Sequence, residues 1–297
     1  MFYLNVLTGT TSQGLMWTLL TIGLFISFRI LKFPDLTTEG SLPLGAVVTV
    51  VLINGGVNPI VSMIIAALFG AMVGITTGTL ATYLKIQPIL AGILTMTALF
   101  SITFRVLGGR STVAISGASL VNSLSFITLN RRYEAILVGI FITAISIVFL
   151  VWFFSTKVGY AIRATGSNPK MATASAINTN RTLIGTLALS NAFIAISGGM
   201  IAQFEFGSAI VTIGQGSIVI GLASVIIGEK IFFRKRNSIF FKLIAVSFGA
   251  IVYRCIVAFA LIIPMLEATD LRLITAILVV LTLCFPALKR RKSKMMV

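Results

Sequence analysis

Long apolar segments constrain this sequence more than any other feature. Stretches of about 20 mainly apolar residues, the length that crosses a bilayer as a helix, follow one another along the 297-residue chain. Only 10% of the residues are charged, whereas soluble domains carry about 25%. We predict one all-α, polytopic membrane bundle over 1–297, with about 8–10 segments. The expected spans are 14–31, 41–57, 59–82, 88–107, 134–154, 183–206, 214–233, 239–261 and 270–287.

Two regions interrupt this pattern. The segment 41–57 is short and follows the polar stretch FPDLTTEG, and the segment 207–228 is rich in glycine. Short or glycine-interrupted spans are typical of broken or re-entrant helices that line a pathway. We expect such helices in both regions.

The basic residues predict the orientation. The chain has 23 Lys and Arg against seven Asp and Glu, and basic residues gather in the cytosolic loops of membrane proteins. If 157–181 is cytosolic, alternation also places Lys85, 234–236 and the C-terminal KRRKSK in the cytosol, and makes 108–133 the main external segment. The sequence has no stretch of interleaved basic and aromatic residues, so the positive charge does not indicate nucleic-acid binding. The residues that break the orientation rule are Arg105, Arg110, Arg131, Arg132, Arg254 and Arg272.

A compact polar segment at 157–182 separates two apolar spans. Asn168 can accept hydrogen bonds from the first free N–H groups of a helix, and Pro169 suits its first position. Lys170 then opens an Ala-rich, helix-favouring run. We predict a short helix over 168–177, with Asn178 as a left-handed stop.

This short helix would carry a small apolar face. Met171, Ala174 and Ile177 recur at helical spacing. An apolar face outside the bilayer favours a protein partner, while an ordinary connecting loop is the alternative.

Polar residues inside or beside the spans are candidates for a pathway or gate, because ionisable groups in a membrane are costly and often functional. Helix capping, water-exposed interface positions and packing are the alternatives for individual members. Glu229, beside Lys230, suggests the cytosolic interface or a partner contact. The candidates for the pathway are Asp35, Glu39, Ser190, Asn191, Gln203 and Glu205.

Gly70, Gly74 and Gly78 repeat at intervals of four within one span. Small residues at this spacing let two helices approach closely. We expect them to pack inside one subunit, with a contact between two copies as the alternative.

The sequence also limits the chemistry of this chain. It contains no G-x-x-x-x-G-K-[ST] phosphate loop and no His, so neither that mode of ATP binding nor a Ser–His or Cys–His catalytic set is available. Cys255 and Cys284 lie in apolar runs without metal-ligand spacing. We expect no enzyme activity, cofactor or metal in this chain.

The stretch GYAIRATGSNPKMATASAINTNRTLIGTLALSNAFIAISGGMIAQ, 159–203, resembles the cytoplasmic segment of permeases in the branched-chain amino acid and ribose ABC importer family. The matching residues include Gly159, Asn168 and Met171, but Ala176 stands where the family usually has Gly. FPDLTTEGSLPLGA, 33–46, is similar to a subgroup linked with tryptophan or tyrosine uptake. GQGSIVIGLASVIIGEKIF, 214–232, matches the family's Gly-rich penultimate region.

This resemblance implies a transport subunit of a bacterial cell membrane, with a cytosolic C-terminus. The short helix would be the coupling helix that docks on an ATPase. The partners would be a second copy of the chain, two cytosolic ATPases that bind ATP and Mg, and an extracytoplasmic substrate-binding lipoprotein. An aromatic amino acid is the favoured solute; a nucleoside or a sugar, an ion-coupled carrier and a structural scaffold are the alternatives.

Overall fold

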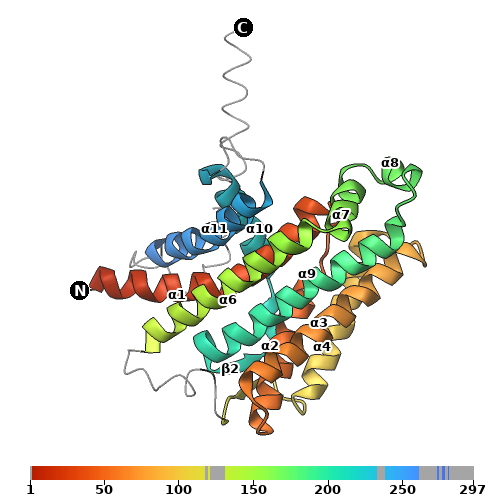
Figure 1. The fold of residues 1–297 in the computed structure, drawn as a ribbon. Helices are drawn as coiled ribbons and strands as arrows, with labels where there is room; N and C mark the ends of the chain where they lie inside the picture. Colours follow the sequence, from red (N-terminus) through yellow and green to blue (C-terminus); the bar gives the residue numbers. More distant parts are fainter. Residues whose placement is uncertain are drawn as a thin grey trace.

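The computed structural model describes residues 2–117, 120, 131–232, 238–260, 273, 276, 277 and 280 (Figure 1). Most of the expected span at 270–287 and much of the external segment lie outside these residues. The helices are α1 (Phe2–Leu24), α2 (Thr38–Asn54), α3 (Pro59–Thr82), α4 (Pro88–Val106), α6 (Arg131–Phe154), α7 (Lys157–Ser167), α8 (Pro169–Ala174), α9 (Thr179–Ile201), α10 (Ser217–Phe232) and α11 (Ile239–Ala260).

Shorter elements extend or join these helices. Two π-helical segments, Phe25–Ile30 and Ala202–Phe206, continue α1 and α9, and a 3₁₀ turn spans Val211–Gly214. Strands β1 (Thr112–Ala114) and β2 (Ser208–Ile210) pair antiparallel, with Val113 opposite Ala209. The sequence did not predict this ribbon, because three-residue strands are too short to show a period-two pattern.

The predicted all-α membrane bundle is confirmed. In the described part of the chain, seven helical segments are long and apolar enough to cross a membrane, and α2 is a shorter apolar helix. The first such segment is Val6–Ile30, so it begins earlier than the predicted residue 14. Thr10 and Thr11 lie in this added part of the span, and both hydroxyls donate to the carbonyl oxygen of Leu7, which satisfies them within the helix.

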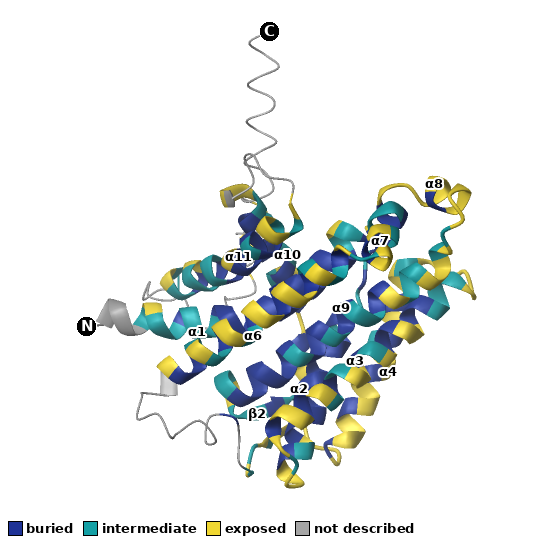
Figure 2. Ribbon diagram, in the orientation of Figure 1, coloured by how far each residue is buried: buried dark blue, intermediate teal, exposed yellow. Residues whose placement is uncertain are grey.

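Helix α2 is buried in the middle of the bundle, against α3, α4 and α9 (Figure 2). The chain reaches it through a non-helical connection between Ile30 and Thr38. At its other end, Asn54 donates to the carbonyl oxygen of Ala114 and accepts from the Ser116 N–H, at 2.9 and 2.8 Å. The β-ribbon side of the molecule therefore covers this end of α2.

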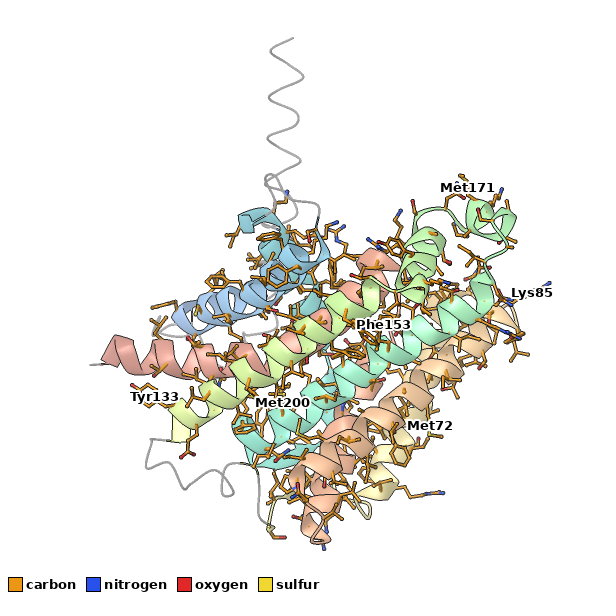
Figure 3. The ribbon with its side chains drawn as sticks, viewed as in Figure 1. Met72, Lys85, Tyr133, Phe153, Met171 and Met200 are labelled. Carbon is orange, nitrogen blue, oxygen red and sulfur yellow. The ribbon has the colours of Figure 1, made fainter. Side chains whose placement is uncertain are left out.

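Helices α3 and α9 pack along each other at glycines. A Cβ added at Gly70 or Gly74 would lie 2.5 or 2.2 Å from a backbone oxygen of α9, and one at Gly78 would lie 2.9 Å from Ile184 Cα. The three glycines thus face α9 of the same chain. The opposite face of α3 exposes Ile64, Leu68 and Met72, a surface suited to lipid or to another membrane helix. Figure 3 labels Met72 on this face.

Candidate functional site

Helix α7 fixes the polar segment to the membrane bundle. Its buried residues Gly159, Ile162 and Gly166 recur on one face. A Cβ added at Gly166 would lie 1.9 Å from the carbonyl oxygen of Ile30, so only glycine permits this contact with the end of the first span. Helix α7 is therefore packed directly against the end of the first span.

Helix α8 projects beyond α7. Asn168 Oδ1 accepts from the Met171 N–H at 3.2 Å, and Pro169 occupies the first turn, so both predicted capping residues are in place. Met171 is 67% exposed, and Ala174 is exposed as well. Figures 2 and 3 show α8 as an exposed tip, with Met171 at the same end of the molecule as Lys85.

The end of this helix differs from the sequence prediction. α8 stops at Ala174, so Ile177 follows the helix instead of extending its face. Asn178 is not a left-handed stop: its φ is −75°, and its side chain accepts from the Arg181 N–H at 3.1 Å as the cap of α9. Ala176 takes the left-handed conformation instead, with φ of 60°. The Asn178 side chain is used by the following helix, and the turn therefore falls two residues earlier.

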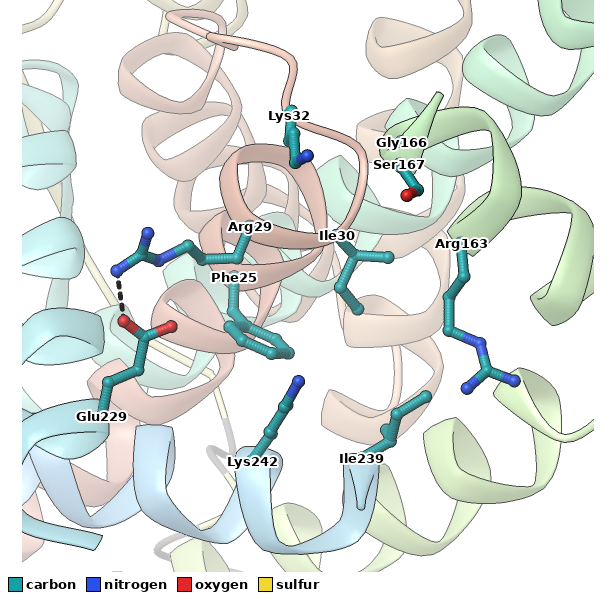
Figure 4. A pocket seen from close by; sticks show the side chains of 10 residues that line it. All are labelled: Phe25, Arg29, Ile30, Lys32, Arg163, Gly166, Ser167, Glu229, Ile239 and Lys242. Atoms are coloured by element: carbon teal, nitrogen blue, oxygen red, sulfur yellow. Dashed lines mark hydrogen bonds and ion pairs between the residues drawn. The ribbon is translucent and has the colours of Figure 1, made fainter. Parts of the chain in front are cut away.

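A basic cavity of 310 Å³ lies beside α7 at this end of the bundle (Figure 4). Arg29 forms an ion pair with Glu229, which links the end of the first span to α10. The cavity lies where the predicted cytosolic ends of four elements meet: the π-helical end of the first span, α7, α10 and α11. Its basic lining residues are Arg29, Lys32, Arg163 and Lys242.

A buried polar network holds the interrupted entry to α2. Asp35 is fully buried; its carboxylate accepts from the Thr37 N–H at 3.0 Å and from the Asn191 amide at 2.8 Å. Asn191 also accepts from Ser41 at 2.6 Å and donates to the carbonyl oxygen of Leu187 at 3.0 Å. Asp35 and Asn191 are therefore brought together, and every polar atom of the Asn191 side chain has a partner.

This network continues into the neighbouring helices through hydroxyl groups. Thr37 contacts Thr77 on α3 at 2.9 Å between their Oγ1 atoms, and Thr77 donates to Thr95 on α4 at 3.1 Å. All three side chains are buried. Sequence analysis missed these threonines because a lone Thr in a span usually bonds its own helix, as Thr77 also does with Val73.

Glu39 lies away from this network, at the junction of the two chain interruptions. Its Oε1 accepts from the Gly216 N–H at 3.0 Å. A Cβ added at Gly214 would lie 1.9 Å from the Glu39 carbonyl oxygen, so the turn before α10 touches the backbone of α2. Glu39 also lines a 220 Å³ cavity between α2, α4 and this turn.

Glu205 is held inside the protein by two other elements. Trp17 on α1 donates its indole N–H to Oε2 at 2.8 Å, and Arg254 on α11 lies 3.5 Å from Oε1. The Arg254 guanidinium also stacks over the Trp17 ring at 4.2 Å. This arrangement explains why Arg254 departs from the predicted charge pattern: a carboxylate neutralises it within the bundle.

The other two candidates bind backbone groups. Ser190 donates to the carbonyl oxygen of Gly23 at 2.7 Å and ties α9 to α1. Gln203 Oε1 accepts from the Leu120 N–H at 3.1 Å, while its buried Nε2 has no hydrogen-bond partner among the described residues. The structure thus separates the pathway candidates into an α2-entry network, the Glu39 cavity, the Glu205 cluster and two backbone contacts.

Comparison with known proteins identifies the family. The model of the branched-chain amino acid transport system permease component matches residues 6–283. This chain belongs to that permease family. No solved structure matches it.

The most informative relatives of this permease are transport subunits. It is 32% identical over 91% of its length to the tyrosine transport system permease protein of Clostridioides difficile, of which the match covers 87%. It is 27% identical to the galactose/methyl galactoside import permease protein MglC of Haemophilus influenzae, over 71% of this chain and 65% of the relative. The autoinducer 2 import system permease protein LsrD of Escherichia coli is 25% identical, over 61% and 54%.

The permease is therefore a transport component rather than an enzyme, in a family of ABC-type permeases with multiple membrane helices. Members of such a family work with an ATPase and a binding protein. In the described residues no group of three or more His, Cys, Asp or Glu side chains is placed to hold a metal ion.

Proposed function

We propose that this permease is the membrane subunit of an ATP-driven importer that carries an amino acid, with tyrosine or tryptophan as the favoured solutes. The tyrosine transport permease, similar over nearly the whole chain, supports the solute class. Two copies would form a homodimer with the pathway at their two-fold axis. The importer would lie in the bacterial cell membrane with its C-terminus in the cytosol.

The observation that carries this proposal is the exposed, capped helix α8 on its fixed base α7. An exposed tip at one end of the bundle, with Met171 and Ala174 beside Lys170 and Thr173, suits a groove in a protein partner. Two cytosolic ATPases, which bind ATP and Mg, would each hold one such tip. Closure of the ATPases would move α7 and α8 as a unit.

The contacts of α7 suggest how this movement reaches the spans. Gly159 packs against the backbone of Phe154 at the end of α6, and Gly166 packs against Ile30. α9 begins just after α8 at Thr179. Motion of the tip would therefore tilt α6, α9 and the first span together, as in alternating access by rigid-body rocking.

Sugar and signal-molecule permeases among the relatives favour a second candidate solute class, which includes nucleosides and sugars. In both cases an extracytoplasmic binding protein would deliver the solute and set most of the specificity. A more distant candidate is an ion-coupled carrier.

Transport in sealed vesicles tests the proposal. The permease, its ATPase and its binding protein are reconstituted with ATP at the ATPase face, and uptake of labelled L-tyrosine, L-tryptophan and galactose is measured. We expect amino-acid uptake that stops when the ATPase phosphate-loop Lys is replaced by Ala and persists with a protonophore. Uptake that needs an ion gradient and no ATPase would contradict it, and uptake of galactose alone would reassign the solute.

A further inference from the structure

We propose that the Glu39 carboxylate binds the ammonium group of the solute inside the permease, in the cavity between α2, α4 and the turn before α10. The inference deepens the proposed function and rests on it, because it assumes that the solute is an amino acid. It adds a recognition step inside the membrane subunit to the selection made by the binding protein.

The first support is the depth of the cavity. Met96 and Phe100 line it from α4, which runs from Pro88 to Val106. At about 1.5 Å per residue, these two residues lie roughly 12 and 18 Å along the helix, near the middle of a hydrocarbon core about 30 Å thick. The carboxylate of Glu39 therefore sits at the level where a crossing solute is farthest from water.

The second support is the charge of Glu39. Its carboxylate accepts one backbone hydrogen bond, from Gly216, and no Lys or Arg pairs with it in the described part of the chain. Glu205 and Glu229, in contrast, each pair with an arginine. An acidic group at this depth is costly without a counter-ion, and the ammonium group of an amino acid supplies one.

The third support is the shape and lining of the cavity. Its volume of 220 Å³ is below the 300–1,000 Å³ that is typical of drug-sized ligands, so it suits a small metabolite. The apolar part of its lining is Pro43, Met96, Phe100 and Val211, and the polar part is the Glu39 carboxylate with Thr97 and Gln215. This combination fits an ammonium group on a molecule that also carries an apolar or aromatic side chain.

The fourth support is that backbone contacts fix the site. Gly214 touches the backbone of α2, and Gly216, with φ of 79°, turns its N–H toward Glu39. Two interrupted segments thus meet at one point, which is how broken helices build solute sites in other transporters. The carboxylate is held before the solute arrives.

Binding to the purified permease–ATPase complex in lipid nanodiscs, without the binding protein, tests this site. Saturation-transfer NMR titrations use three probes: L-tyrosine, tyramine, which keeps the ammonium group, and 3-(4-hydroxyphenyl)propionate, which lacks it. We expect the wild type to bind the first two and to bind the third at least tenfold more weakly. Glu39→Gln keeps a hydrogen-bond acceptor for Gly216 and should weaken tyrosine and tyramine binding at least tenfold.

Glu229→Gln, at the far inner end of α10, is the matched control and should leave all three affinities unchanged. The proposal is overturned if the wild type binds none of the probes, if the propionate binds as tightly as tyrosine, or if Glu39→Gln binds tyrosine normally. ATP-driven tyrosine uptake by the wild type is measured in parallel. Its absence would refute the proposed function, whereas normal uptake with unchanged Glu39→Gln binding would refute this subsite alone.

Discussion

The amide of Asn191 donates a 2.8 Å hydrogen bond to the carboxylate of Asp35, 156 positions earlier in the sequence. Both side chains are fully buried, and the bond joins α9 to the non-helical entry of α2. A buried carboxylate without a donor is costly. This contact therefore fixes where α2 begins relative to α9.

Asn191→Leu should destabilise the permease. Leucine has a similar size but cannot donate to Asp35 or accept from Ser41, and loss of such a bond to a charged group costs about 1.5–3 kcal/mol. Thermal unfolding of the purified permease in detergent measures the effect. Ser247→Ala is the control, because that hydroxyl bonds only its own helix at Leu243. Equal midpoints for the two variants would contradict the assigned role of Asn191.

Gly74→Ala should force α3 and α9 apart, because the new Cβ would lie 2.2 Å from the carbonyl oxygen of Leu187. Overpacking of this kind costs about 1–3 kcal/mol. Gly185→Ala on α9 is the matched control: its Cβ meets nothing within 4 Å, and alanine should gain up to about 1 kcal/mol of helix propensity. Unfolding midpoints should move in opposite directions, and a shared direction would argue against the glycine contact.

Ala176→Gly should stabilise the turn after α8. Alanine pays about 1–2 kcal/mol in the left-handed conformation, and glycine removes that cost while losing about 0.5–1 kcal/mol of chain entropy. The net gain of at most about 1.5 kcal/mol should slow hydrogen exchange of the amides at 168–182 by up to roughly tenfold. Ala174→Gly, within helix α8, should speed the same exchange; faster exchange in Ala176→Gly would contradict the strain argument.

Ala174→Asp should uncouple the permease from its ATPase. The residue is exposed on α8, so the fold should survive, while a buried carboxylate beside Met171 opposes docking in a groove. We expect loss of ATPase co-purification or of solute-stimulated ATP hydrolysis, with an unchanged unfolding midpoint. Ala174→Ser is the control that keeps the size and adds no charge. Normal stimulated hydrolysis in Ala174→Asp would remove α8 from the coupling role.

Glu205→Gln should cost about 3–5 kcal/mol, because it leaves Arg254 without a counter-ion in a mostly buried site. The side chains of Glu205 and Arg254 are only 8% and 16% exposed. The double variant Glu205→Gln with Arg254→Met should recover much of that loss. The exposed pair gives the comparison: Glu229→Gln should change the unfolding free energy by at most about 1 kcal/mol. Additive losses in the double variant would show that the Glu205 pair is not coupled.

Much of the bundle follows from local sequence. Apolar segment length set the spans, because a helix must satisfy its backbone inside the lipid. Asn168 and Pro169 marked the start of α8, because capping depends on neighbours within one turn. The repeat of Gly70, Gly74 and Gly78 predicted a close helix contact, because small residues four positions apart lie on one face of a helix. The sequence left open which helix would be the partner.

Only the tertiary structure decided which distant groups meet. Asn191 beside Asp35, Arg254 beside Glu205 and Gly216 beside Glu39 are contacts between segments far apart in the chain. The spacing of residues within one span does not predict such contacts, because the contacts depend on how the helices rotate and cross. The residues that cross the membrane were thus set by the sequence through local hydrophobicity, while the cavity that faces Glu39 exists only because two interrupted segments pack together.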